Sequence, residues 1–379
     1  MAAKIDLLDP GSPGVDSALL RSLADASRTR AAIVFGDAEA ERGARACGVR
    51  VLGRIAAPLR AGDGTIGRWL AGRALRHGLR AFENTVKGPL ATWSEPMLSA
   101  ALMAGVPADR LEARVVAVSG PSEPVPMWAR LLGATPRSEV AVRGVGLELG
   151  SVLSRRGWTV GDAIDPESIP VGLEAEAARP IEPGEERLVV GVVSSPPEAL
   201  DLREVVTSAA TLVASGHRVV FVVSPNLHRL GEEAGWLVEA EKVIRGGDVS
   251  MRIDHRMEDP GVLAPELDLV VVPSPRRPWH VPSVLALRAW LAAGVPAVVA
   301  VDRSASALVQ DGVDARLYPR GDRNALARIL ARLASDDRLR SEMGHAAAAR
   351  HGHRIRKATA GSPDQSSGSF ADRPRAASR

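Results

Sequence analysis

Two short apolar runs in the second half of the chain, residues 268–273 and 295–301, are rich in valine and show no polar alternation. This pattern is typical of parallel strands that are buried on both faces of a sheet. Between them, three prolines in 273–280 exclude a regular element. Residues 281–293 then place apolar side chains at helical spacing, and Gly294 follows the last turn. A strand, a crossover helix and a second strand together predict a βαβ unit.

The rest of the chain alternates in the same way between apolar runs and segments with helical periodicity. In the first half, the expected strands are 5–8, 31–35, 49–52, 115–118 and 139–143, and the expected helices are 16–26, 38–47 and 97–104. The second half opens with a strand at 187–193, a helix at 199–215 and a strand at 218–223. This alternation predicts an α/β fold of two doubly wound, Rossmann-like domains.

A change in composition separates the two halves. Residues 174–186 are rich in glutamate, alanine and proline and poor in large apolar residues, which is typical of an interdomain linker. We therefore expect an N-terminal domain over residues 1–180, a C-terminal domain over 181–355 and a disordered tail over 356–379. Ligands of open α/β sheets bind at the carboxyl ends of the strands, so two such domains predict a site in a cleft between them.

Several ordered segments of the C-terminal domain carry a family resemblance: residues 268–274, 291–299 and 309–317, followed by the pair 321–330 and 335–344. They resemble the donor domain of GT-B glycosyltransferases of the group-1 class, which includes many retaining enzymes, and the last pair resembles the two closing helices of that domain. The resemblance implies transfer of a sugar from a nucleotide-sugar donor to an acceptor that the sequence does not identify. It also implies a reaction without a metal or other cofactor.

Two sets of charged positions differ from the usual pattern of that family. The family usually carries two glutamates separated by seven residues in this loop and helix, and alignment on Gly294 places these positions at Val281 and Ala289. The family also tends to have an arginine and a lysine after the first donor-domain strand, where this sequence has no basic residue until Arg203. The chain therefore resembles a divergent member of that family, and its catalytic residues are not identified.

The donor site implied by the resemblance lies in the loops after two strands and at the start of the following helix. Arg276 and Arg277 suit a diphosphate, because a guanidinium group binds phosphate oxygens through two N–H groups. The helix start offers free backbone N–H groups to an anion, and His280 just before it could donate to a phosphate or carry a proton. The predicted donor-binding residues are Ser194, Ser195, Arg276, Arg277, His280, Val281, Pro282 and Ser283.

Four residues of the N-terminal domain are candidates for the acceptor side. Gly11 and Gly14, in the first strand-to-helix turn, would let the backbone approach a ligand closely. Ser94 and Glu95 could meet an acceptor hydroxyl. Structural alternatives stay open for both pairs: a plain connection for the glycine turn, and for Glu95 a carboxylate that favours the dipole of the following helix.

Composition limits the classes of partner. The net charge is only +3 and the basic residues are spread along the chain, so nucleic-acid binding is not expected. The single cysteine, Cys47, excludes an internal disulfide. No apolar run approaches the length of a membrane span and no secretory signal is visible, so we expect a cytoplasmic protein without a transmembrane segment. Peripheral membrane contact stays open, since enzymes of the resembled class often use lipid-linked acceptors; the basic amphipathic pattern in 62–88 is also that of a solvated outer helix.

Two functions from different classes remain open at this point. One is a glycosyltransferase, which the resemblance favours. The other is a noncatalytic GT-B module that binds a sugar nucleotide, a glycan or a protein partner, which the missing carboxylates favour. A nucleotide-sugar epimerase on the same architecture would need acidic residues and histidines in the cleft, whereas His345 and His351 fall in the C-terminal helix or at its end.

Overall fold

The structure, a computed structural model, describes residues 4–10, 15, 17–25, 30–56, 65–82, 88–118, 137–169, 188–193, 201, 203–216, 219–223, 249–253, 263–275, 283–301 and 307–352. The expected linker at 174–186 and the tail at 356–379 lie outside these ranges. The domain boundary near residue 180 therefore stays a prediction.

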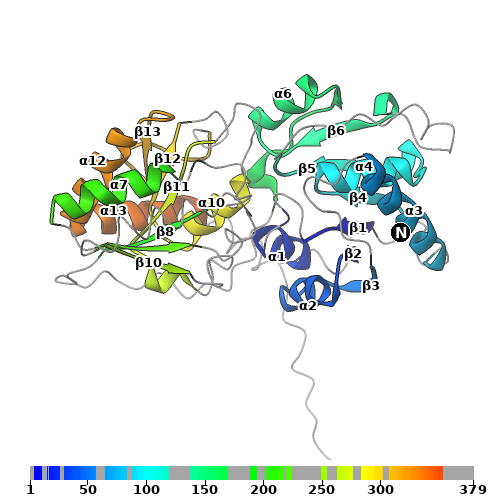
Figure 1. Cartoon of the computed structure of the whole chain (residues 1–379), viewed down its shortest axis with the longest axis horizontal. Helices are drawn as coiled ribbons and strands as arrows, with labels where there is room; N and C mark the ends of the chain where they lie inside the picture. The colour runs from blue at the N-terminus through cyan, green and yellow to red at the C-terminus, as the bar shows by residue number, and fades with distance from the viewer. Residues whose placement is uncertain are drawn as a thin grey trace, which may run out of the picture.

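The N-terminal domain is built on a seven-stranded parallel sheet in the order β3-β2-β1-β4-β5-β6-β7 (Figure 1). Its strands are β1 (Lys4–Leu8), β2 (Arg30–Phe35), β3 (Val51–Ile55), β4 (Leu90–Thr92), β5 (Leu111–Val115), β6 (Ala141–Gly144) and β7 (Thr159–Val160). Its α-helices are α1 (Ser17–Asp25), α2 (Ala38–Ala46), α3 (Thr65–Ala81), α4 (Glu95–Met103) and α6 (Leu147–Arg155), with 3-10 turns η1 (Ala108–Arg110), η2 (Arg137–Glu139) and η3 (Pro166–Ser168).

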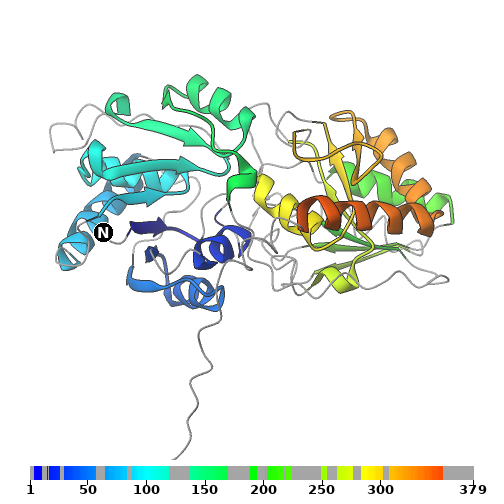
Figure 2. The ribbon, with the colours of Figure 1, turned by 180° about the vertical axis from the view of Figure 1, so that it is seen from behind.

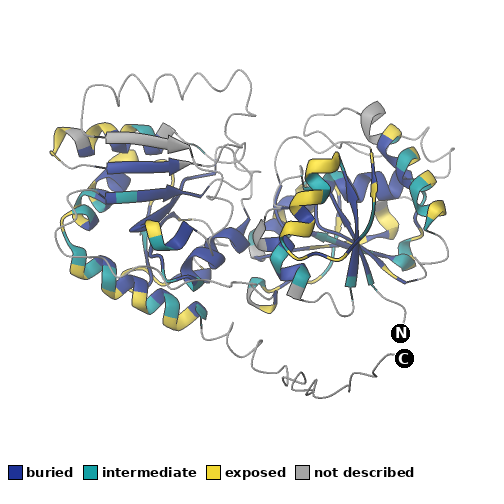
Figure 3. Ribbon diagram, turned by 90° about the horizontal axis from the view of Figure 1, so that it is seen from below, coloured by how far each residue is buried: buried dark blue, intermediate teal, exposed yellow. Residues whose placement is uncertain are grey.

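Helices cover both faces of this sheet because successive residues of a strand point to opposite faces. Ile5 and Leu7 of β1 belong to the core that contains α3, α4 and α6. Leu8, the next residue, belongs to the core that contains α1 and α2. Figure 3 shows the buried strands between helices whose outer faces are exposed.

The C-terminal domain has a six-stranded parallel sheet in the order β10-β9-β8-β11-β12-β13. Its strands are β8 (Leu188–Val192), β9 (Val219–Val223), β10 (Val249–Ile253), β11 (Leu269–Val272), β12 (Ala297–Ala300) and β13 (Ala315–Tyr318). Its helices are α7 (Arg203–Ala214), α10 (Val284–Ala292), α12 (Arg323–Ala334) and α13 (Asp337–Ala347), with a 3-10 turn η7 (Ala264–Glu266) and a π-helical turn η8 (Ala348–Gly352). The prediction of two doubly wound, Rossmann-like domains is confirmed.

The two domains meet through α10, which lies between the C-terminal sheet and α1 (Figures 1 and 2). Residues 284–291 of α10 are all buried, and all of them except Arg288 are apolar. Leu19 and Leu23 of α1 belong to the same continuous core as Val284 and Leu287 of α10. The seam is therefore packed with apolar side chains here, and the expected cleft does not extend between α1 and α10.

One arginine joins the domains by hydrogen bonds. Arg288 of α10 is buried, and its Nη1 donates to the carbonyl oxygen of Pro166 at 2.5 Å and to that of Ile169. Burial lowers the pKa of this guanidinium, and the charge of Asp165 opposes that shift. Two backbone carbonyls of the N-terminal domain thus accept hydrogen bonds from a helix of the C-terminal domain.

One predicted strand is misplaced and several elements were not predicted. The strand expected at 115–118 is instead β5 (Leu111–Val115), in which Glu112 and Arg114 alternate with buried apolar residues. A strand with one polar face lacks the continuous apolar run that marked the other strands. For β7, β10 and β13 no strand was predicted, and α6 was not recognised as a helix.

Two helical glycines give opposite expectations for substitution by alanine. A methyl group at Gly344 of α13 would lie 2.6 Å from the carbonyl oxygen of Gly294, whereas one at Gly43 of α2 meets no atom within 4 Å. We expect Gly344→Ala to lower the free energy of unfolding by about 1–3 kcal/mol through overpacking. Gly43→Ala should raise it by about 0.4–1 kcal/mol, because alanine reduces the entropy of the unfolded chain. Urea titration followed by circular dichroism measures both, and a Gly344→Ala protein as stable as the parent would contradict this packing of α13.

Candidate functional site

The predicted donor site lies mostly outside the described residues. Ser194, Ser195, Arg276, Arg277, His280, Val281 and Pro282 fall there, as do Gly11 and Gly14 on the acceptor side. Their roles remain predictions from the sequence. Ser283, Ser94 and Glu95 are described, and the structure places them as follows.

Ser283 is the residue that precedes α10, at the N-terminal end of the helix. Its side chain makes no capping hydrogen bond to the helix. The residue is only 4% exposed, and its hydroxyl has no hydrogen-bond partner among the described residues. A buried polar group without a partner costs about 1–3 kcal/mol, and the first N–H groups of a helix also lack partners within the helix. Ser283 and the start of α10 therefore place together several donors that have no partner among the described residues, at a point where the helix dipole favours an anion.

A buried glutamate that the sequence reasoning missed lies at the same edge of the C-terminal sheet. Glu204 stands in the first turn of α7, and its Oε2 accepts from the Tyr318 hydroxyl at 2.7 Å and from the Ser274 N–H at 3.0 Å. Tyr318 ends β13 and Ser274 follows β11, so three elements meet at the carboxyl ends of the strands. Burial and the charge of Glu204 raise the pKa of Tyr318, which keeps its hydroxyl protonated as a donor.

The second oxygen of this carboxylate is unused. Oε1 of Glu204 is buried and has no hydrogen-bond partner among the residues that the structure describes. A carboxylate oxygen is an acceptor, and it is suited to a ligand hydroxyl. In the sequence, Glu204 has the appearance of an ordinary acid in the first turn of a helix, so only the tertiary contact with Tyr318 distinguishes it.

On the acceptor side, the structure gives the side chains of Ser94 and Glu95 hydrogen-bond partners within the protein. Ser94 is the N-cap of α4, and its buried hydroxyl accepts from the Met97 N–H at 3.3 Å. Glu95 accepts from Arg156 Nη1 at 2.6 Å and from the Trp158 indole N–H at 2.9 Å. Both side chains are buried and engaged by the protein itself, so neither presents its polar group to an acceptor. The alternative prediction fits better, since Glu95 is the first residue of α4.

Glu95→Gln tests this structural role. The amide keeps an oxygen for Trp158 but loses the charge opposite Arg156, whose side chain is 7% exposed, as is that of Glu95. We expect the free energy of unfolding to fall by about 1.5–3 kcal/mol, the usual contribution of a hydrogen bond to a charged group. Chemical unfolding measures this loss. A Glu95→Gln protein of unchanged stability would show that the ion pair is not a structural contact and would restore Glu95 as a candidate for acceptor chemistry.

The described ranges show neither a metal cluster nor a membrane-spanning helix. Within these ranges, no group of three histidine, cysteine or carboxylate side chains gathers in a way that suits a metal ion. Among the helices that the structure describes, each is too short or too polar to cross a membrane.

The chain is similar in structure to several solved proteins. HepE of Anabaena, solved with UDP and glucose, has a TM-score of 0.62 at 14% identity, over 95% of this chain and 98% of the other. Sucrose-phosphate synthase from Thermosynechococcus elongatus has a TM-score of 0.58 at 15% identity, over 95% and 100%. A putative UDP-N-acetylglucosamine 2-epimerase from Listeria monocytogenes has a TM-score of 0.56 at 12% identity, over 95% and 96%.

At the level of sequence, no protein-family model and no curated protein matches this chain. The structural likenesses show that the chain has the GT-B fold. Identity this low shows the fold alone. Because the same fold occurs in transferases and in a putative epimerase, the activity has to be argued from the site.

Proposed function

We propose that this protein binds a nucleotide sugar at the carboxyl edge of the C-terminal sheet and transfers the sugar to an acceptor. The observation that carries the proposal is Ser283, a buried hydroxyl at the N-terminal end of α10 without a partner among the described residues. A diphosphate there would accept from this hydroxyl and from the first N–H groups of the helix. The solved complex of HepE with UDP and glucose supports a uridine nucleotide as the first donor to test.

In this proposal, different residues of the chain bind the phosphates, balance their charge and contact a hydroxyl of the donor. Ser283 and the start of α10 hold the phosphates, and Arg276 and Arg277 balance their charge, as the sequence predicts. When the bond to the sugar breaks, charge develops on the leaving diphosphate, and fixed donors stabilise that charge more strongly than the ground state. Glu204, through its unused oxygen, accepts from a hydroxyl of the donor. We place this reaction in the cytoplasm, as expected from the sequence.

A noncatalytic sugar-nucleotide module is the second candidate, and one observation favours it. Ala289 occupies the position of one of the family's two glutamates, and it is 0% exposed within α10. A carboxylate at this position would be buried in the core, so this helix cannot supply the family's usual acidic group there. Binding with slow release of free nucleoside diphosphate supports the enzyme, and binding without any turnover supports the module.

A pair of serine variants tests the donor site. Ser283 and Ser99 are both buried hydroxyls without partners among the described residues, but Ser99 lies in α4 of the N-terminal domain. Replacing either by alanine removes an unsatisfied group, so both variants should fold as well as the parent. Calorimetric titration with UDP, GDP and ADP and their sugar conjugates should show affinity about ten- to hundredfold weaker in Ser283→Ala, since a hydrogen bond to a charged group contributes about 1.5–3 kcal/mol. Ser99→Ala should bind as the parent does, and equal affinities in all three proteins would remove Ser283 from the site.

A further inference from the structure

A cavity of about 220 Å³ lies against one face of the N-terminal sheet, on the side covered by α1. Three arginines line it from three different strands: Arg30 of β2, Arg114 of β5 and Arg143 of β6. Trp93, Ser22 and Ser168 also line it, together with the apolar residues Leu23, Ile164 and Ile169. The strand pattern explains this concentration of charge, because Glu112 and Arg114 alternate with Leu111, Ala113 and Val115, which enter the core on the opposite face.

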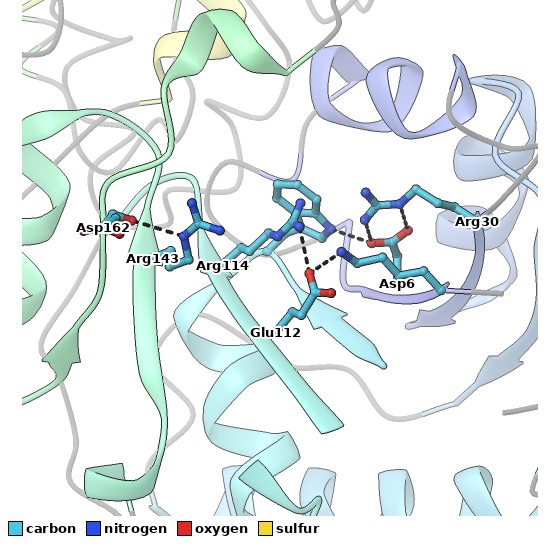
Figure 4. Close-up of polar contacts among 8 residues, drawn as sticks. Asp6, Arg30, Glu112, Arg114, Arg143 and Asp162 are labelled. Carbon is cyan, nitrogen blue, oxygen red and sulfur yellow. Dashed lines mark hydrogen bonds and ion pairs between the residues drawn. The ribbon is translucent and has the colours of Figure 1, made fainter. Parts of the chain in front are cut away.

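Buried contacts hold two of these arginines in place (Figure 4). Asp6 is only 1% exposed, and it accepts from Arg30 Nε at 2.8 Å, from Arg30 Nη2 and from the Trp93 indole N–H at 2.9 Å. The guanidinium carbons of Arg30 and Arg114 lie 5.5 and 5.0 Å from the centre of the Trp93 ring, within the range of a cation–π contact. The arginines are therefore positioned before any ligand arrives, which reduces the entropy lost on binding.

The cluster carries more positive than negative charge. Lys4, Arg30, Arg114 and Arg143 stand against the carboxylates of Asp6 and Glu112, and both Lys4 and Arg114 pair with Glu112. Arg143 Nε donates to the backbone carbonyl of Asp162 at 3.2 Å, and no carboxylate pairs with this guanidinium in the part of the chain that the structure describes. Burial, together with the charges of Arg114 and Arg30, lowers the pKa of Lys4. The charge imbalance therefore favours an anion.

We propose that this pocket binds the phosphate group of a small phosphorylated molecule. A phosphate monoester carries a charge of about −1.5 to −2 and has three acceptor oxygens. Its charge matches the excess of two cations in the cluster, and its three oxygens match three arginines that approach from different strands. The volume is below the roughly 300–1,000 Å³ of pockets that enclose whole drug-sized ligands, so the site takes a phosphate with a few attached atoms. The residues of this pocket are separate from Ser283 and Glu204, and the inference does not rest on the proposed donor site.

The pocket has a physical connection to the seam between the domains. Ser168 and Ile169 line it, and the carbonyl of Ile169 accepts from Arg288 of α10. A phosphate bound to Ser168 would restrain the segment 164–169, which Arg288 of α10 already contacts through the carbonyl of Ile169. Its occupancy is therefore measurable by a second readout, which is protection of the amide hydrogens around residues 164–169 against exchange.

Calorimetric titration with inorganic phosphate and with glycerol 3-phosphate tests the proposal. We expect both to bind the parent protein and to protect residues 164–169 from exchange, and we expect Arg143→Gln to weaken binding at least tenfold. Arg143 is exposed, so this variant should unfold at the same temperature as the parent. Arg338→Gln is the control, because that side chain is 88% exposed on α13, far from the pocket in sequence and on the other domain.

Four results would overturn the proposal. The first is that neither phosphate compound gives heat on titration, and the second is that Arg143→Gln binds with the same affinity as the parent. The third is that acetate binds as tightly as phosphate. The fourth is that the protein associates with vesicles containing phosphatidic acid but does not bind free phosphate. Weakening by Arg338→Gln to the same extent as Arg143→Gln would count as a fifth. Failure of the donor-site test with Ser283→Ala leaves each of these results unaffected.

Discussion

Replacing Asp314 with alanine is expected to lower the free energy of unfolding by about 3 kcal/mol, because it removes two hydrogen bonds to a charged group that contribute about 1.5–3 kcal/mol each. Asp314 is 0% exposed, and its carboxylate accepts from the Gln310 N–H at 2.7 Å and pairs with Arg350 at 2.7 Å and His351 at 3.3 Å. These contacts attach η8 to the turn before β13. Without the carboxylate, the Gln310 N–H and the buried ring of His351 lose their partner.

Chemical unfolding at neutral pH measures this loss, and Asp314→Asn is the matched control. The asparagine amide keeps an oxygen for the Gln310 N–H but carries no charge for Arg350. It should therefore lose less stability than Asp314→Ala. An alanine variant within about 0.5 kcal/mol of the parent, the range of ordinary surface substitutions, would contradict the burial of this carboxylate.

The same group predicts how this stability changes with pH. Burial alone would raise the pKa of Asp314, but hydrogen bonds from His351 and the Gln310 N–H and the charge of Arg350 together hold it below the ordinary value of 3.8. The ionised carboxylate therefore stabilises the folded state above that pH, and the contribution is lost as the pH falls through the lower folded pKa. The difference in stability between the parent and Asp314→Asn should shrink as the pH falls below about 4.

Replacing both Arg276 and Arg277 with alanine is expected to have the largest effect on ligand binding. Each charge-assisted contact to a phosphate contributes about 1.5–3 kcal/mol, so loss of both would weaken the binding of a sugar nucleotide by about two to four orders of magnitude. The expectation rests on their place in the sequence between β11 and α10. Calorimetric titration with the sugar nucleotide that the parent binds measures it.

A double variant of equal charge change is the control for this experiment. Arg332 and Arg338 are exposed on α12 and α13, and their replacement by alanine removes the same two positive charges from the C-terminal domain. This control should bind the sugar nucleotide as the parent does. If the variant that lacks Arg276 and Arg277 binds with the same affinity as the parent, these arginines are excluded from the site. If both double variants bind equally weakly, the change in net charge alone explains the loss of affinity.

The fold was largely predictable because most strands are continuous apolar runs. Residues 268–273 and 295–301 predicted β11 and β12, and the helix expected at 281–293 is α10. The strand that was misplaced, β5, alternates between apolar and charged residues because one of its faces lines the arginine pocket. Its charged face is thus the reason that the apolar pattern did not mark it.

The site was predictable only where a local rule applies. The start of α10 followed from the proline and the helical periodicity, and Ser283 lies there as expected. Glu95 contacts a residue 63 positions away in the sequence, Glu204 contacts residues 70 and 114 positions away, and His351 contacts a residue 37 positions away. No local sequence pattern predicts contacts at these separations. His351, expected at the end of the C-terminal helix, is in fact buried against Asp314.

Release of free nucleoside diphosphate from a bound sugar nucleotide tests the central claim most directly. Without an added acceptor, water takes the sugar, so the parent protein incubated with the sugar nucleotide that binds in the calorimeter should slowly release free sugar and the diphosphate. At subsaturating donor, Ser283→Ala should do so at a lower rate, and Ser99→Ala should match the parent. Binding of the sugar nucleotide without any release of diphosphate would contradict the transferase account and would favour the noncatalytic module.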